Sequence, residues 1–362
     1  MNLAASLWQT ALERAGLEHG VEVQRLENTA EATREWDDFV EACPRATFFH
    51  LSGWRRVYRR ACGYRDWFLA ARRDGRLVGV LPLAEVRSRL FGHRLVAAPL
   101  AVYGGPAAAD PAAEAALEDA ACALAERLSV AWLELRRRQD SGRGRPHEDL
   151  YVTFRRPLPS DPEAAFAQIP RKQRAMVRKG EAAGLEAVID DDVDGFWRVY
   201  AESVRNLGTP VYARRYFHVL REVFGPRCRV LGVRHRGRAV AAVMSFYFRD
   251  EVLPYYGGGT ARARSLKAND FMYWSLMRQA VLDGCRVFDY GRSKRDTGAY
   301  HFKKNWGFTP QPLHYEYHLL RRREPPRINP LNPRYRLFVA AWRRLPLAVA
   351  RRLGPWLARG LA

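Results

Sequence analysis

Two side chains near residue 290 have the types and the spacing that acid–base chemistry or anion binding requires. Asp289 and Arg292 stand near the end of a predicted strand, Val287 to Arg292. Ligands of α/β proteins bind beyond the ends of strands. At such a place Asp289 can orient or deprotonate an amine, and Arg292 can bind a phosphate or a carboxylate. The alternative is structural: a buried ion pair or a carboxylate that caps a turn.

The choice between lysine and arginine gives further candidates. The chain has 54 arginines and six lysines, and every lysine stands after residue 170: Lys172, Lys179, Lys267, Lys294, Lys303 and Lys304. Where arginine is the usual cation, a lysine indicates that a compact point charge is needed. The alternative for any of them is an exposed lysine beside a strand or helix.

A basic cluster and a glycine run complete the candidate residues. Arg171, Lys172, Arg174, Arg178 and Lys179 stand together without an acidic residue, which is typical of phosphate binding or of a solvated helix face. Tyr256 precedes Gly257-Gly258-Gly259, a run that permits close approach of a substrate or forms a tight turn before a helix. Tyr216, on a predicted helix from Tyr212 to Phe224, is a further substrate-binding candidate.

Composition limits what these residues can belong to. With 362 residues, 48% of them hydrophobic, the chain is long enough for two domains with real cores. No apolar run approaches the ~20 residues that span a bilayer, and Glu13 and Arg14 interrupt the region where a signal peptide would be apolar. The five cysteines lack metal or redox spacing. We therefore expect a cytoplasmic protein without a metal or tightly bound cofactor.

The elements that position the candidates occur twice in the chain. Asp74-Gly75 and Arg236-Gly237 each precede an apolar strand. Each copy continues with a second strand, a helix and a further strand, at spacings of about 153 to 162 residues between the copies. The matched segments are Val102 to Pro106 with Tyr255 to Gly259, Ala112 to Leu128 with Asn269 to Asp283, and Trp132 to Arg136 with Val287 to Arg292. This order predicts a duplicated domain with a mixed α/β sheet.

Helices are predicted before each hairpin. They span Thr33 to Val40 and Trp54 to Ala61 in the first copy, and Asp192 to Val204 and Tyr212 to Phe224 in the second. A proline-rich segment, Pro157 to Pro170, separates the copies. We expect a first domain over 1–156, a linker over 157–170, a second domain over 171–320 and a basic tail over 321–362.

Several motifs resemble the FemAB family, whose members are tandem GNAT-fold acyltransferases or aminoacyltransferases. Those in the body of the chain are Thr47 to His50 with Trp54, Val102 to Pro106, the basic helix Arg171 to Gly180, Phe288 to Ser293 and Tyr300 to Phe308. The tail, Asn329 to Phe338 and Trp342 to Pro346, is similar to the FemAB-like branch associated with exosortase (PEP-CTERM) and exopolysaccharide systems. The coiled-coil arm of the family's second domain is missing, so the resemblance does not decide between aminoacyl-tRNA and acyl-CoA as the donor.

The resemblance implies an α/β (α+β) fold with two GNAT-like domains and an active site in the second. It implies transfer of an acyl or aminoacyl group to an amine of an envelope-polysaccharide or peptidoglycan precursor, with aminoacyl-tRNA or acyl-CoA as co-substrate. Two alternatives stay open: a CoA-dependent GNAT N-acyltransferase, and a non-catalytic module that binds polysaccharide-assembly partners at the membrane.

The same resemblance implies roles for residues near 300. Lys303, in the pair Phe302-Lys303, matches the family's lysine at the acyl-transfer centre, where an ammonium stabilises an oxyanion or a leaving oxygen. Phe302 and Tyr300 join the substrate-binding candidates. Direct attack by the amine needs no Ser or Cys nucleophile, and the sequence has no Gly-x-Ser-x-Gly motif. Gln139 to Gly144 matches a CoA pyrophosphate signature but leads to Pro146 rather than a helix, so we interpret it as accidental.

The tail predicts an amphipathic helix pair. Residues 321–362 hold eleven arginines and one glutamate. Phe338, Ala341, Trp342 and Leu345 fall on one helix face, and Val349, Leu353, Trp356 and Leu357 continue it after Pro346. Arginines fill much of the rest, which favours contact with an anionic membrane. The alternative is that the apolar face packs on the first domain.

Overall fold

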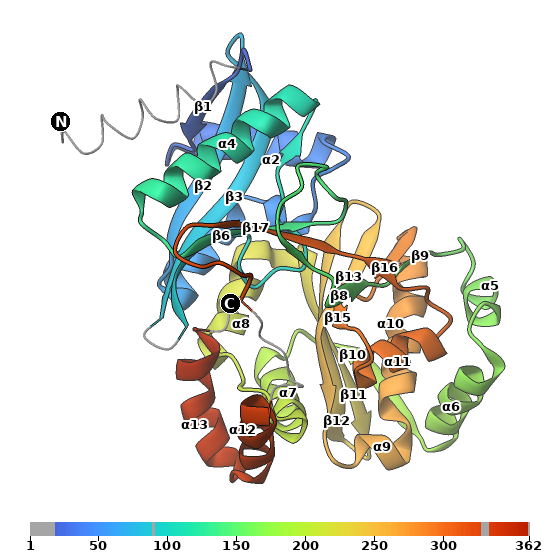
Figure 1. Cartoon of the computed structure of the whole chain (residues 1–362). Coiled ribbons are helices and arrows are strands. Elements are labelled where there is room, and N and C mark those ends of the chain that lie inside the picture. Colours follow the sequence, from blue (N-terminus) through green and yellow to red (C-terminus); the bar gives the residue numbers. More distant parts are fainter. Residues whose placement is uncertain (1–18, 89–90, 327–332, 361–362) are drawn as a thin grey trace. The chain divides into compact units, whose positions relative to one another are not determined.

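The structure is a computed structural model, and it describes residues 19–88, 91–326 and 333–360, the last stretch with side chains from residue 336 on. Two compact units emerge (Figure 1). Unit 1 comprises Met1–Asp149, Pro312–Pro326 and Gly360–Ala362; unit 2 comprises Leu150–Gln311 and Arg327–Arg359. The tail residues Asn329 to Asn332 lie outside the described part of the chain.

Unit 1 is built on one mixed sheet, with strand order β1-β2-β3-β4-β6-β17-β7 and β5 paired to β3. Its elements are β1 (Glu22–Arg25), α2 (Ala30–Ala42), a 3₁₀ turn (Phe48–His50), α3 (Gly53–Val57), a π-helical turn (Tyr58–Cys62), β2 (Arg65–Arg73), β3 (Arg76–Ser88), β4 (Gly92–Ala97), β5 (Ala107–Ala108), α4 (Pro111–Arg127), β6 (Trp132–Arg137), β7 (His147–Glu148) and β17 (His314–Leu319).

Unit 2 is built on a sheet of order β10-β11-β12-β13-β14-β9, beside a small sheet of order β15-β8-β16. Its elements are β8 (Tyr151–Thr153), β9 (Arg155–Pro157), α5 (Pro162–Ala167), α6 (Arg171–Ala182), β10 (Leu185–Ile189), α7 (Val193–Leu207), α8 (Arg214–Phe224), a 3₁₀ turn (Gly225–Arg227), β11 (Cys228–His235), β12 (Arg238–Phe248), β13 (Glu251–Gly259), α9 (Ala263–Leu266), α10 (Ala268–Leu282), β14 (Val287–Asp289), β15 (Ser293–Lys294), α11 (Gly298–Asn305), α12 (Pro333–Arg344) and α13 (Leu347–Ala358), with β16 at Gln311–Pro312.

Sequence signals explain where the helices begin. Asp110 and Asp192 accept hydrogen bonds from backbone N–H groups at the start of α4 and α7. Thr297 does the same for α11, the helix that carries Lys303. In unit 2, α7 lies on one side of the sheet and α10 and α11 on the other (Figure 1). The predicted mixed α/β architecture with flanking helices is confirmed.

The two sheets repeat the same local irregularities. The hairpin turns at Asp74-Gly75 and Arg236-Gly237 both have positive φ at both residues, near 50° and 75°. This geometry matches the right-handed twist of a two-residue hairpin. Each hairpin also has a bulge at the same place, between Ala71 and Arg72 and between Val233 and Arg234. The shared turn and bulge support duplication of one ancestral domain.

The compact units have boundaries that differ from the expected ones, because the closing strands are exchanged along the chain. β9 lies near the start of unit 2 and pairs antiparallel with β14, near the end of its first chain segment. β17 follows residues 150–311 of unit 2 in the chain but pairs antiparallel with β6 in unit 1. The segment expected as a linker, 157–170, contains α5, which Asp161 caps. Strands of three to six residues carry too short a pattern to reveal such an exchange.

The tail helices α12 and α13 pack within unit 2. Both α12 and α13 contact α7. Trp342 is buried, as are Ala350, Gly354 and Ala358 on α13. The predicted apolar face is therefore divided: part of it packs, while Val349, Leu353 and Trp356 are exposed. Within the described residues, no helix is long and apolar enough to cross a membrane.

Candidate active site

Two neighbouring parallel strands of unit 2 separate after a short pairing. β13 and β14 pair only at Glu251 with Val287 and at Val252 with Phe288. β13 continues for seven more residues to Gly259, whereas β14 ends at Asp289. No described strand pairs with this side of β13 beyond Val252. The sheet therefore opens toward the residues that the sequence singled out. On one side is the free edge of β13, meaning the stretch from Leu253 to Gly259 that no described strand pairs with on this side, and on the other is the loop after β14.

Lys303 holds the loop that follows β14. Its Nζ donates to the backbone carbonyls of Tyr290, Gly291 and Arg292, at 2.8, 2.9 and 3.1 Å. An ammonium has three N–H donors, so all of them are used. The side chain is 9% exposed, and the Phe154 ring lies 5.4 Å from Nζ. Lys303 thus ties α11 to the carboxyl end of β14.

Burial changes the titration of this amine. Desolvation lowers the pKa of Lys303 from 10.5 to about 7, while the nearby Asp289 carboxylate acts in the opposite direction. The three carbonyls also favour the protonated amine, since they accept its hydrogens. Lys303 therefore titrates near neutral pH and can change charge during a reaction cycle.

Asp289 forms the buried ion pair and the turn contact that are the structural alternative to a catalytic role. The carboxylate is fully buried, and its Oδ2 lies 3.0 Å from Nε of Arg155. Its Oδ1 accepts hydrogen bonds from the N–H of Gly291 at 2.7 Å and from the hydroxyl of Thr153 at 3.4 Å. Arg155 also pairs with Glu251. Asp289 therefore fixes the turn whose carbonyls receive Lys303.

The other candidates near Lys303 lie around the same loop. Arg292 is half-buried with its guanidinium 4.8 Å from the Tyr151 ring. Tyr300 packs edge-on against Phe154 at 5.5 Å. Phe302 faces the core instead, against Tyr273 and Trp306. Sequence reasoning missed Arg155 and Phe154, which stand on β9 and just before it, because that segment was expected to belong to the first domain.

A buried tyrosine pair lies on β13 and α8. The hydroxyls of Tyr216 and Tyr256 are 2.7 Å apart, and the two side chains are 2% and 5% exposed. Tyr200 and Tyr212 pack against the Tyr256 ring. Burial raises the pKa of Tyr256 well above 10, so its phenol stays protonated and can donate a hydrogen bond. The structure therefore brings two separately chosen candidates into direct contact.

The glycine run after Tyr256 is part of β13 and not a turn. None of Gly257, Gly258 and Gly259 has a positive φ. A Cβ at Gly258 would meet Ser203 at 2.5 Å, and one at Gly259 would meet Ala263 at 2.5 Å. The run thus allows α7 and α9 to approach the strand closely. The buried Oδ1 of Asn269, on α10, lies against Gly259 without a hydrogen-bond partner among the described residues.

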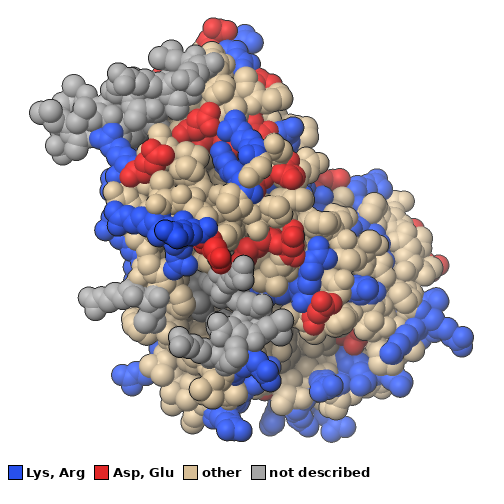
Figure 2. Space-filling view, viewed as in Figure 1, with Lys and Arg blue, Asp and Glu red and all other residues tan. Residues whose placement is uncertain are grey.

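The basic helix is placed apart from these residues. It is α6, and Gln173, Val177 and Gly180 face the core. Arg174 and Arg178 line a separate cavity, whereas Arg171, Lys172 and Lys179 are exposed and do not line it. Lys and Arg side chains are spread over much of the molecular face shown in Figure 2. The sequence-predicted site residues therefore form three groups: those around Lys303, the tyrosine pair, and the α6 arginines.

The corresponding opening in unit 1 is filled by the chain itself. β4 and β6 also pair in parallel over two residues, Leu95 with Leu133 and Val96 with Glu134. Beyond that point the N–H of Gly104 donates to the carbonyl of Arg136 at 2.7 Å. The Arg136 guanidinium donates to the carbonyl of Ala101 at 2.8 Å. Of the two large sheets, it is therefore the sheet of unit 2 that has an open edge after its parallel strand pair.

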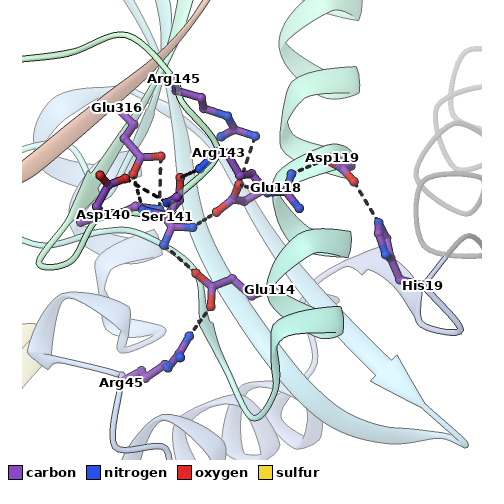
Figure 3. A network of polar contacts seen from close by, with 12 residues as sticks. His19, Arg45, Glu114, Glu118, Asp119, Asp140, Ser141, Arg143, Arg145 and Glu316 are labelled. Carbon is purple, nitrogen blue, oxygen red and sulfur yellow. Dashed lines mark hydrogen bonds and ion pairs between the residues drawn. The ribbon is translucent and has the colours of Figure 1, made fainter.

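The segment with the CoA-like signature is held by an ionic network (Figure 3). Glu118 is 1% exposed and pairs with Arg137, Arg143 and Arg145. The N–H of Ser141 donates to the Glu316 carboxylate at 2.8 Å. The segment leads to β7 and not to a helix N-terminus. Its backbone is therefore fixed for packing, in agreement with the interpretation that the signature is accidental.

Comparison with known proteins gives the class of the fold. An acetyltransferase (GNAT) domain model matches residues 167–304. A search of curated proteins gave no match. Among solved structures, FemX covers 87% of this chain and 100% of its own, with a TM-score of 0.62 at 14% identity.

Two further structures align over most of both chains. The C-terminal domain of a lysylphosphatidylglycerol synthetase from Agrobacterium fabrum covers 80% of this chain and 92% of its own, with a TM-score of 0.53 at 14% identity. A tandem GNAT protein from the clavulanic acid pathway covers 82% and 97%, with a TM-score of 0.50 at 17% identity. The chain thus carries an acetyltransferase (GNAT) domain at residues 167–304 and has the fold of tandem GNAT acyltransferases.

Proposed function

We propose that unit 2 transfers an acyl group from an extended donor, bound along the free edge of β13, to an amine. The observation that carries this proposal is the early separation of β13 and β14. A free strand edge presents backbone N–H and C=O groups that an extended ligand can pair with, as a peptide does in β-augmentation. Amide groups in the arm of an acyl donor suit such pairing.

The proposed chemistry is direct attack. The neutral amine forms a bond to the acyl carbon, the bond from that carbon to the donor's leaving sulfur or oxygen breaks, and the proton that the amine loses passes through water to that leaving atom. Tyr256, which stays protonated and contacts Tyr216, is the proposed hydrogen-bond donor to the leaving group. Lys303 is the proposed positioning residue, because its ammonium holds the loop that presents Arg292. Arg292 then binds a phosphate or carboxylate of a substrate.

The substrates follow from the resemblance and the structural neighbours. We propose an envelope-polysaccharide or peptidoglycan precursor as acceptor, in keeping with the FemX likeness and the tail motifs of the exosortase-associated branch. Acyl-CoA and aminoacyl-tRNA are the two donor classes to test. At a ligand concentration of 100 times Kd, a bound donor stabilises the fold by about 2.7 kcal/mol. A thermal-shift series with acetyl-CoA and with a charged tRNA is expected to give such a shift for one class, and a flat response to both would contradict the proposal.

We also propose that the tail places the enzyme on an anionic membrane surface. On α13 the small residues Ala350, Gly354 and Ala358 are buried, while Val349, Leu353 and Trp356 are 39%, 47% and 68% exposed. Burial of the small face and exposure of the large apolar face is the reverse of what water favours. Exposed arginines accompany this stripe: Arg343, Arg344, Arg352 and Arg359. An apolar stripe beside arginines is typical of an interfacial helix.

The tail proposal predicts a defined loss of vesicle binding. Replacing both Leu353 and Trp356 by Ser is expected to weaken binding to phosphatidylglycerol vesicles at least tenfold, because each side chain contributes about 1.5–3 kcal/mol when buried in an apolar phase. Co-sedimentation at low salt measures this effect. Leu282→Ser, at a 57% exposed position on α10, is the matched control. Equal binding by all three proteins would show that the stripe does not enter the membrane.

A further inference from the structure

One cavity in unit 2 lies apart from the residues of the proposed transfer site. Its volume is about 770 Å³, within the range of small-molecule sites. Lys303, Asp289, Tyr216 and Tyr256 do not line it. The lining comes from α5, α6, β10, β11 and α10.

Three arginines from two helices surround this cavity. Arg174 and Arg178 stand on α6 and Arg278 on α10. Across the described residues, none of them forms an ion pair with a carboxylate, although Glu163 and Glu181 are on the same lining. The guanidinium groups that line the cavity can form charge-assisted hydrogen bonds with an anionic ligand.

The walls between the arginines are apolar and partly aromatic. Phe166 and Trp274 pack together with ring centroids 4.6 Å apart, and the Arg178 guanidinium lies 5.6 Å from the Phe166 ring. Ile189 is 40% exposed on β10 at the same cavity. A ligand that covers these surfaces must itself have a sizeable apolar part.

Two of the neutral hydrogen-bond donors of the lining are already used within the protein. The Ser275 hydroxyl donates to the carbonyl of Phe271 at 2.8 Å. The Gln279 amide donates to Asp283 at 2.9 Å. A nucleobase needs such donors at its polar edge, whereas an aliphatic chain does not. The cavity therefore favours an aliphatic ligand over a nucleotide.

We infer that this cavity binds a phosphate-headed lipid, with the phosphate on Arg174, Arg178 and Arg278 and the chain along Phe166, Trp274 and Ile189. This inference goes beyond acyl transfer and does not depend on it, because binding is its only readout. A carrier lipid held here would keep a membrane-linked acceptor close to the protein that modifies it.

The test uses the whole chain and a soluble probe. Isothermal titration with dodecyl phosphate, below its micelle concentration, is expected to show saturable binding at one site. Three control ligands are compared with dodecyl phosphate. Dodecyl maltoside has the chain but no charge, inorganic phosphate has the charge but no chain, and uridine diphosphate has a nucleoside in place of the chain. Each is expected to bind at least tenfold more weakly. Equal or tighter binding of uridine diphosphate would overturn the aliphatic assignment, and equal binding of the maltoside would overturn the role of the arginines.

Neighbouring positions on α6 supply a matched pair of variants. Arg178 and Lys179 are both exposed, but only Arg178 lines the cavity. Arg178→Glu is expected to weaken dodecyl phosphate binding at least tenfold, because it removes a charge-assisted hydrogen bond and adds repulsion. Lys179→Glu makes the same charge change and is expected to leave binding within twofold of wild type. If both variants lost binding equally, the effect would come from the overall charge of the helix and not from the cavity, which would contradict the inference. Circular dichroism checks that each variant folds.

Discussion

Lys303→Met is expected to lower acyl-transfer turnover by about 10²-fold, because the loop that presents Arg292 loses the ammonium that positions it. The structure adds that this change also destabilises unit 2. Three buried carbonyls, those of Tyr290, Gly291 and Arg292, lose their donor. An unsatisfied buried carbonyl costs about 1–3 kcal/mol, so we expect the variant to be less stable than wild type as well as slower. Steady-state turnover and urea unfolding, measured on the same variant, separate the two effects.

The pH dependence distinguishes the Lys303 ammonium from a purely structural side chain. Its pKa is about 7 in the folded protein and 10.5 ordinarily. Between these values the unfolded chain binds the proton and the folded chain does not, so the stability of wild type relative to Lys303→Met rises as pH rises from about 7 to 10.5. If turnover needs the ammonium, turnover of wild type falls as pH rises through 7. Lys303→Arg keeps its charge over this pH range. Its turnover is therefore expected to stay below that of wild type and not to decrease further as pH rises through 7. Turnover of Lys303→Met equal to wild type would remove the assignment.

Asp289→Ala is expected to lower the free energy of unfolding by about 3–5 kcal/mol, the usual cost of leaving a buried charge without its partner. Asp289 is fully buried, and its loss removes one of the carboxylates that Arg155 pairs with, the other being that of Glu251. The turn at Gly291 loses its acceptor as well. Thermal and urea unfolding measure this loss.

Glu251→Ala is the control, because it removes the other carboxylate partner of Arg155 from a half-buried position. Its side chain is 23% exposed, and a loss below about 1 kcal/mol is expected. A stable Asp289→Ala variant with lost turnover would instead favour the acid–base role that the strand-end position first indicated.

The sequence predicts the repeated elements well, since these carry local signals. Asp74-Gly75 and Arg236-Gly237 identify equivalent hairpins through their turn chemistry, and the helices begin within a few residues of their expected starts. The exchange of β9 and β17 has no local signal, because pairing depends on strands that are distant in the sequence. For this reason the sequence predicts domain boundaries at 156 and 320, whereas the compact units divide the chain at other residues.

The candidate site shows the same division between local and distant information. Lys303 was selected by its motif, but its partners are backbone carbonyls, which no residue type reveals. Tyr216 and Tyr256 stand on different elements, and only folding brings their hydroxyls together. Asp289 was found at the end of its strand, while its partner Arg155 was assigned to the other domain. Residue types therefore locate the candidates, and tertiary contacts decide between structural and chemical roles.

The central claim is that an acyl donor binds along the free edge of β13 in unit 2. Hydrogen–deuterium exchange of the whole chain, with and without a saturating donor, tests it directly. With acetyl-CoA or with a charged tRNA, we expect slower exchange in peptides covering residues 253–259 and 289–294. Peptides covering residues 95–106 are the internal control, because that opening is filled by Gly104 and Arg136. Protection confined to residues 95–106, or no protection at 253–259 with either donor, would contradict the account.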